Sequence, residues 1–372
     1  MKADIIHISG FDSYNTHDSG NYIVFNFLRD LKYDSKMILA LGKTKQDSDT
    51  FLIRKHDIIN RIEEAKVVVL HDSLLSYKEI KALYEKLKCQ IVIITMTHFH
   101  LTTPQTVGCL SYPETNTPEE LQRNKAFLQT KKETLSDVPI TLVYGSTYSG
   151  TITKQFGMYE QTRFIPLPAE IPYCKTSVEL VRKHLKLDNE KKYIFWGTTQ
   201  PKTHRKGKHL FDQVLDLLWT DLTEQQRQKI NILNAGPNPG IFGTESNFST
   251  IYYGYQRTRK DMSVLYKASD VSVCTTIADA GPMMISESMC NETPVIAFDR
   301  SIACDLCIDE ETGYLVSDLS VKKMAQNIKK ILFEDDIEKI SKKSRNKYLT
   351  FQNKHVILSK WNNLFTKLME KE

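Results

Sequence analysis

Two adjacent cations occur where a strand-like run gives way to an apolar helical segment. The run ends at Gly197 and Thr198, Arg205 and Lys206 follow a polar loop, and the helical segment begins at Lys208. The amides at a helix start, together with two positive charges, suit a ligand with two or more negative charges, such as a diphosphate. Basic doublets are equally common in solvated loops, so the pair alone leaves both interpretations open.

A second feature is a glycine-containing turn before another helix. The turn has the sequence Asp279-Ala280-Gly281-Pro282-Met283, and an apolar helical segment follows it. Proline suits the first position of a helix, and the amides of Ala280, Gly281 and Met283 would lack partners there. We therefore expect a nest of amides that binds an anion or a hydroxyl group, with Gly281 allowing the ligand to approach closely.

Glu287 lies more than one turn into that second helix. Its carboxylate can accept hydrogen bonds from two vicinal hydroxyl groups, such as those of a ribose. An ordinary surface position explains Glu287 at least as well when it is taken alone. The binding interpretation therefore depends on the neighbouring turn.

Further polar residues follow strand-like runs in the first half of the chain. His98 and His100 follow one such run, His71 and Asp72 follow the run before it, and Gly20 lies in a polar turn before an apolar helix. Buried histidines with a structural role, and a helix-capping turn at Gly20, are the alternatives to a binding site.

These residues need a scaffold, and the hydrophobic pattern predicts one. The first half alternates β-branched runs with segments that carry apolar residues at helical spacing, which is typical of a parallel sheet. The expected strands are Ile5–Ser9, Lys36–Ala40, Lys66–Leu70, Gln90–Thr95 and Ile140–Tyr144, and the expected helices include Asn21–Leu31 and Tyr77–Leu87.

The same alternation restarts after a proline-rich break. Pro166, Pro168 and Pro172 cannot continue a helix or a central strand, so we place a domain boundary after Pro168. Two sheets of this type bind ligands at the carboxyl ends of their strands. The expected strands of the second half are Tyr193–Trp196, Ile230–Leu233, Val271–Cys274, Pro294–Phe298 and Gly313–Val316, and its helices are Lys208–Trp219, Ser263–Ala268, Met283–Cys290 and Val321–Phe333.

Length and composition favour a two-domain cytosolic protein. The chain has 372 residues, of which 41% are hydrophobic and 26% are charged. No apolar stretch approaches the roughly 20 residues of a membrane span, and the first residues lack the apolar region of a signal peptide. Seven cysteines, an odd number, indicate reduced thiols, and Cys304 and Cys307 lack the partners that a zinc site needs.

The charge balance argues against a nucleic-acid partner. The formal net charge is only +5, although cations outnumber acids near the C-terminus. That segment could contact anionic lipid headgroups, or it could be the solvated face of a helix. Its cations are Lys339, Lys342, Lys343, Arg345, Lys347, Lys354, Lys360, Lys367 and Lys371.

The second half resembles the donor domain of the retaining glycosyltransferases of family 4, which have the GT-B fold. That family has a glutamate, seven residues, a second glutamate, an alanine-methionine pair and a Pro-Val strand. This chain has Asp279, seven residues, Glu287, then Ser288-Met289 and Pro294-Val295. The resemblance implies an α/β architecture of two Rossmann-like domains that face a cleft, over residues 1–168 and 169–350, with a C-terminal helix over 351–372 that packs back on the first domain.

The resemblance also implies roles for individual residues. It assigns Glu287 to the ribose, Asp279 to the transferred sugar and Lys206 to the diphosphate, with Arg205 as the second cation. His98, or else His100, would lie beside the anomeric carbon and the acceptor. The remaining donor-binding residues would be Gly20, Gly197, Thr198, Ala280, Gly281, Pro282 and Met283.

The chain departs from the family at several glycines. Ser19 precedes Gly20 where the family has two glycines, and Asp299 and Arg300 stand where it has two more. Asn291 replaces the glycine that caps the donor-site helix, and asparagine can still adopt the left-handed cap conformation.

The resemblance implies transfer of a sugar, with retention, from a nucleotide diphosphate sugar to a glycan or lipid-linked glycan acceptor in cell-surface polysaccharide biosynthesis, such as lipopolysaccharide or capsule. It implies no metal and no other cofactor, and a location in the cytoplasm at the inner face of the membrane. One alternative is an enzyme of the same fold that acts on a small soluble acceptor. The other is a catalytically silent scaffold, which the missing glycines favour.

Overall fold

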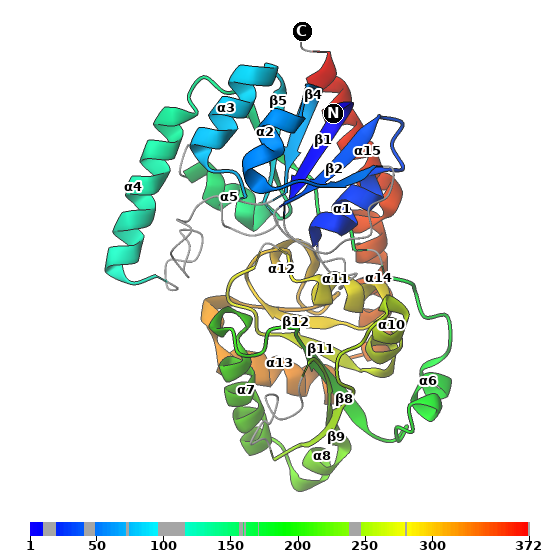
Figure 1. The fold of residues 1–372 in the computed structure, drawn as a ribbon. Coiled ribbons are helices and arrows are strands. Elements are labelled where there is room, and N and C mark those ends of the chain that lie inside the picture. Colours follow the sequence, from blue (N-terminus) through cyan, green and yellow to red (C-terminus); the bar gives the residue numbers. More distant parts are fainter. Residues whose placement is uncertain are drawn as a thin grey trace. The chain divides into compact units, whose positions relative to one another are not determined.

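The computed structural model describes residues 1–9, 20–40, 49–71, 74–95, 116–155, 159, 161–169, 171–237, 247–279 and 281–370. The chain forms two compact units (Figure 1). The first contains Met1–Pro168 together with Lys354–Glu372, and the second contains Ala169–Asn353. Each unit is built on one parallel sheet, which confirms the predicted class of two Rossmann-like α/β domains.

The first unit has a seven-stranded sheet in the order β3-β2-β1-β4-β5-β6-β7. All of its strand pairs are parallel. The strands are β1 (Lys2–Ser9), β2 (Ser35–Leu39), β3 (Thr50–Leu52), β4 (Glu64–Leu70), β5 (Gln90–Thr95), β6 (Ile140–Tyr144) and β7 (Gln161–Phe164). Among the described residues of Met1–Pro168, the α-helices are α1 (Gly20–Leu28), α2 (Ile58–Arg61), α3 (Tyr77–Leu87), α4 (Pro118–Thr134) and α5 (Thr147–Gln155).

Both faces of this sheet are buried, because alternate residues of each strand point to opposite sides. Ile6 and Ile8 of β1 pack with residues of α2 and α3, whereas Ile5 packs with residues of α1 and of α15 (Lys354–Met369). The last helix contributes an apolar stripe to this second layer. Its members are Ile357, Trp361, Leu364, Phe365 and Leu368.

The second unit has a six-stranded parallel sheet in the order β10-β9-β8-β11-β12-β13. The strands are β8 (Lys192–Gly197), β9 (Ile230–Ala235), β10 (Ser249–Tyr252), β11 (Val271–Cys274), β12 (Val295–Phe298) and β13 (Gly313–Val316). Its main helices are α6 (Val178–His184), α7 (Lys208–Asp221), α8 (Glu224–Lys229), α10 (Arg259–Ala268), α11 (Met283–Cys290), α12 (Ala303–Leu306), α13 (Val321–Phe333) and α14 (Ile337–Gln352).

Helices cover both faces of the second sheet (Figure 1). Ile194 and Trp196 of β8 pack in a layer with α7 and α13, and Tyr193 and Phe195 pack in the opposite layer with α10 and α11. The strand order reverses between β8 and β11, which lie side by side. In open α/β sheets, this switch point leaves a crevice at the carboxyl ends of the two strands, where ligands bind.

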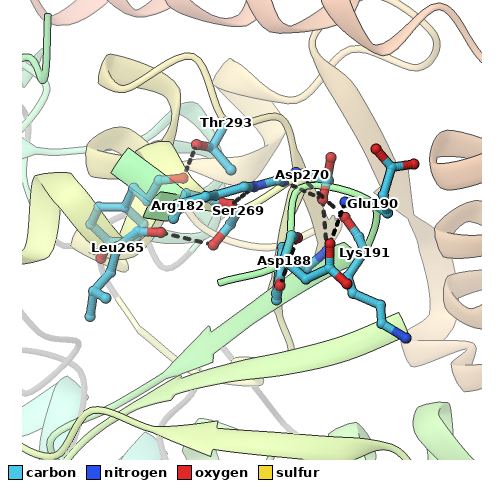
Figure 2. A network of polar contacts seen from close by, with 11 residues as sticks. Arg182, Asp188, Glu190, Lys191, Leu265, Ser269, Asp270 and Thr293 are labelled. Atoms are coloured by element: carbon cyan, nitrogen blue, oxygen red, sulfur yellow. Dashed lines mark hydrogen bonds and ion pairs between the residues drawn. The ribbon is translucent and has the colours of Figure 1, made fainter. Parts of the chain in front are cut away.

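A buried ion pair fixes the amino end of this sheet (Figure 2). Arg182 Nη2 of α6 lies 2.7 Å from Asp270 Oδ2, which also accepts a hydrogen bond from the Tyr193 amide at 2.7 Å. Arg182 Nε donates to the Ala268 carbonyl at 2.9 Å. The network holds α6 against the start of β8 and β11, and it lies at the opposite end of these strands from the switch-point crevice.

The cap of α11 differs from the sequence-based expectation. Asn291 has φ −98°, and the left-handed residue is Glu292, with φ 62°. Asn291 acts through its buried side chain instead: Nδ2 donates to the Glu287 carbonyl at 3.0 Å, and Oδ1 accepts from the Cys174 amide at 2.9 Å. The prediction of a left-handed Asn291 was wrong because the side chain holds the helix end to the preceding segment.

No helix within the described residues combines the length and the apolar character required to cross a bilayer. Several of the C-terminal cations contact groups of their own unit. Arg345 stacks on the Tyr173 ring at 3.5 Å, Lys343 lies 3.7 Å from Glu311, and Lys354 pairs with Asp30.

Candidate functional site

Two loops meet at the switch point of the second unit. The first leaves β8 at Gly197, where a Cβ atom would lie 2.8 Å from the Ala235 carbonyl oxygen, so that β8 and β9 approach closely only because Gly197 lacks a side chain. The Thr198 amide donates to the same oxygen at 3.2 Å. This loop ends in a 3₁₀ turn, His204–Lys206, that carries both predicted cations and precedes α7.

The second loop leaves β11 and is hydrogen-bonded to the first. The Arg205 carbonyl accepts from the amides of Ile277 and Ala278 at 2.8 and 3.3 Å. Gly207 has φ 70°, and a Cβ atom there would lie 1.8 Å from the Thr275 carbonyl oxygen. Glycine is therefore required between the cations and α7, and the backbone contact fixes the position of Arg205 and Lys206 relative to the second loop.

The carboxylate of Asp279 lies at the centre of the two loops. Oδ2 accepts from Lys206 Nζ at 2.6 Å and from Arg205 Nη1 at 2.9 Å. Oδ1 accepts from the Gly281 amide at 3.2 Å. One carboxylate thus engages both predicted cations and one of the amides that we expected to be unpaired before α11.

The electrostatic environment keeps Asp279 ionised. Burial opposes ionisation, but the cations of Lys206 and Arg205 outweigh it, so the pKa of Asp279 lies well below its usual range. Only 14% of the Asp279 side chain and 17% of the Lys206 side chain are exposed. Two positive charges and one negative charge leave this cluster with a net positive charge, which suits an anionic ligand.

Glu287 is held in place by two side chains of α10. The Tyr266 hydroxyl donates to Oε2 at 3.0 Å, and Arg259 Nη1 lies 3.7 Å from Oε1. Burial raises the pKa of Tyr266 well above its ordinary value, and the Glu287 carboxylate adds to this shift. Since only 13% of the Glu287 side chain is exposed, Glu287 is not an ordinary surface residue.

Tyr266 and Arg259 were not predicted from the sequence as partners of Glu287. They are seven positions apart in α10, so they lie on one face of the helix. Nothing in the sequence indicated that this face would point toward Glu287.

The remaining predicted residues are distributed over both units. Pro282 directly precedes α11, which begins at Met283, and Thr198 accepts from the Gln200 amide at 3.2 Å. Gly20 is the first residue of α1 in the first unit. His98, His100, Asp72 and Ala280 lie outside the described residues.

His71 is fully buried rather than facing a cleft. Its Nε2 atom lies 2.8 Å from Nδ1 of His7, which is also buried and was not predicted from the sequence as a candidate. Burial lowers the pKa of His71 to about 3. Both imidazoles are therefore neutral near pH 7, and the burial of His71 favours a structural role over a place in a binding site.

Cysteine and metal-ligand patterns are unremarkable in the part of the chain that the structure describes. Cys304 is partly buried and Cys307 is buried, and burial raises the pKa of Cys304 to about 12. Groups of three or more histidine, cysteine, aspartate or glutamate side chains that could hold a metal ion are absent from these described residues.

A family of known sequences matches part of the second unit. Residues 179–348 match the family of glycosyl transferases group 1, and the match lies within the second unit. A comparison with curated protein sequences gave no significant match.

Solved structures resemble the whole chain. Sucrose-phosphate synthase from Thermosynechococcus elongatus has a TM-score of 0.72 at 16% identity, covering 99% of both chains. Anabaena HepE in complex with UDP-glucose has a TM-score of 0.72 at 12% identity, covering 98% of this chain and 100% of that one. WaaG, a glycosyltransferase involved in lipopolysaccharide biosynthesis, has a TM-score of 0.67 at 13% identity, covering 97% and 99%. At these identities the likeness shows the fold, and the predicted GT-B fold is confirmed.

Proposed function

We propose that this chain is a glycosyltransferase whose second unit binds a nucleoside diphosphate sugar. One observation carries the proposal: two cations and the loop amide of Gly281 converge on the Asp279 carboxylate at the switch point of the second sheet. The family match to glycosyl transferases group 1 falls on this unit. UDP and UDP-glucose are bound in structures of HepE, which has the same fold.

The two cations stabilise the departing diphosphate, which is where negative charge develops in the transition state. The bond between the anomeric carbon and the phosphate oxygen breaks, a bond from the acceptor oxygen to that carbon forms, and the acceptor proton passes to the phosphate oxygen. The acceptor attacks from the face that the leaving group vacates, so the configuration is retained. The charge of Arg205 and Lys206 replaces that of a metal ion, and transfer continues in the presence of EDTA.

Glu287 binds the ribose hydroxyl groups through a carboxylate that Tyr266 and Arg259 hold in position. The sequence resemblance assigns Gly20 to the donor phosphate and His98 to the acceptor. The role of His98 rests on the sequence resemblance alone.

The thermal stability of the protein tests the donor site. UDP, GDP, ADP and their sugars are added in turn, and one nucleotide series raises Tm because it binds only the folded chain. Lys206→Ala and Glu287→Ala each remove most of this rise. If every nucleotide leaves Tm unchanged, a catalytically silent scaffold is favoured over an enzyme. If both variants bind nucleotide as tightly as the wild type, the assignment of Lys206 and Glu287 to the donor site is wrong.

Two classes of molecule are candidates for the sugar acceptor. A lipid-linked glycan is favoured by the likeness to WaaG, a glycosyltransferase involved in lipopolysaccharide biosynthesis. A small soluble acceptor is favoured by the stronger likeness to sucrose-phosphate synthase. Radiolabelled donor incubated with a membrane extract and with a soluble extract separates them: label that partitions into organic solvent supports the first, and label found only in water-soluble products supports the second.

A further inference from the structure

The hydrogen-bond donors that would bind a diphosphate already bind a side chain of the protein, the carboxylate of Asp279. Asp279 accepts from Lys206 Nζ and Arg205 Nη1 through one oxygen and from the Gly281 amide through the other. Cationic side chains and backbone amides of a loop are also the groups that bind a phosphate oxygen. A carboxylate and a phosphate present similar anionic oxygens to such donors.

We propose that Asp279 is a resident anion that competes with the diphosphate of the ligand for Lys206 and Arg205, and thereby weakens nucleotide binding and speeds the release of the nucleoside diphosphate product. This inference rests on the proposed function. It assigns Asp279 a role different from the contact with the transferred sugar that the sequence resemblance implied.

The burial of the cluster supports a competing role. Lys206 and Asp279 are largely shielded from water, so the attraction between them is weakly screened and an incoming ligand must offset it. Because the pKa of Asp279 is low, the carboxylate stays charged near neutral pH and does not lose its attraction for the two cations by protonation.

Asp279 also reduces the electrostatic repulsion between Arg205 and Lys206. Arg205 and Lys206 are neighbours on one 3₁₀ turn that the Gly207 contact holds rigidly, so without Asp279 two like charges would lie close together in a partly buried site. Asp279 neutralises one of them. The remaining net charge still attracts a diphosphate, while a bare dication would hold the product more tightly.

Isothermal titration of the wild type with UDP, GDP and ADP first identifies the nucleotide that binds most tightly. The same nucleotide is then titrated into Asp279→Asn, and the two Kd values test the inference. Asparagine keeps the size and an acceptor oxygen but removes the charge. We expect Kd for the nucleoside diphosphate to fall by about tenfold, the change produced by the loss of one charged hydrogen-bonding partner. Because kcat is then limited by product release, we expect it to fall as well.

Asp270→Asn is the matched control. It removes the same charge from another buried aspartate of the second unit, paired with Arg182 at 2.7 Å, at the opposite end of the strands. We expect it to lower Tm and to leave the nucleotide Kd unchanged. If Asp279→Asn fails to fold, Asp279→Ser provides a second neutral variant, and Asp279→Glu, which keeps the charge, retains the wild-type Kd.

The outcomes separate the two proposals. Unchanged or weaker binding of the nucleoside diphosphate by Asp279→Asn overturns the resident-anion role. If only the nucleotide sugar binds more weakly, the inference is likewise overturned and a contact with the transferred sugar is favoured. If the wild type binds no nucleoside diphosphate, the proposed function itself fails.

Discussion

The Tyr266 hydroxyl donates a hydrogen bond to Glu287 Oε2 over 3.0 Å, from a tyrosine that is almost fully buried. The tyrosine lies on α10 and the glutamate on α11, so the bond joins two neighbouring helices of the second unit. A carboxylate with one oxygen held in this way loses little rotamer freedom when it binds a ribose.

Tyr266→Phe removes this bond without changing the packing of the ring. We expect Kd for the nucleoside diphosphate to rise by about threefold to tenfold, because Glu287 must then be ordered by the ligand. In steady-state kinetics the donor KM should rise while kcat changes little, since the ribose contact is the same in the ground and transition states.

The control is Tyr314→Phe, which removes a similar tyrosine-carboxylate bond, from the Tyr314 hydroxyl to Asp335 Oδ2 at 2.6 Å. Both variants should lose some thermal stability, but only the first should bind nucleotide more weakly. Equal nucleotide affinities in the two variants would count against a positioning role for Tyr266.

Gly207→Ala should disrupt the site and the fold together. The new Cβ atom would overlap the Thr275 carbonyl, which cannot move without breaking the contact between the two loops. We expect the free energy of unfolding to fall by at least about 3 kcal/mol, as for other forced backbone shifts, and nucleotide binding to be lost. Urea unfolding and calorimetry measure the two effects.

Gly254→Ala separates backbone strain from steric overlap. Gly254 has nearly the same conformation, φ 69°, but a Cβ atom there meets nothing within 4 Å. Its cost should be limited to the left-handed conformation, about 1 to 2 kcal/mol. If both variants lose the same amount, the contact with Thr275 does not constrain the loops.

The central strands were predictable because they are buried on both sides. Gln90–Thr95 and Ile140–Tyr144 form β5 and β6 with the predicted bounds. A short, continuous apolar run between turns is typical of a buried strand. The missed strands β3, β7 and β10 lie at sheet edges, where a short strand pairs on one side only and carries a weaker apolar pattern.

The helix α4 was missed for a different reason, and α14 was only one of two interpretations of the cation-rich C-terminal segment. The capping box of Thr117 and Glu120 marks the start of α4, yet this helix buries few apolar side chains and lacks a clear stripe. In α14 the lysines dominate the sequence, whereas Ile340 and Tyr348 face the core.

The site was predictable as a set of residue types but not as a set of contacts. Lys206 and Asp279 are 73 positions apart, and both were selected because each occupies a loop after a strand. Their hydrogen bond depends on the pairing of β8 with β11 and on Gly207, which only the folded chain reveals.

The buried pair of His7 and His71 should make the stability of the first unit depend on pH. Burial lowers the pKa of His71 from 6.5 to about 3, and burial together with the charge of His71 lowers that of His7 well below 6.5. Below pH 6.5 the unfolded chain binds protons at these sites and the folded chain does not, so stability is fully present above pH 6.5 and falls as the pH is lowered toward 3. The expected slope is about 1.4 kcal/mol per pH unit for each histidine.

Replacing both residues, His7→Leu with His71→Leu, should remove this slope. Two apolar side chains of similar size leave no buried polar atom without a partner, so the variant should remain folded at pH 7.5. Urea unfolding of the first unit between pH 7.5 and 4.5 gives the slope for both proteins, and the difference between them cancels the contribution of the carboxylates. His56→Leu serves as the control, because His56 is exposed and its loss should leave the slope as it is in the wild type. Equal slopes in the wild type and the double variant would mean that the buried pair takes up protons in the folded state.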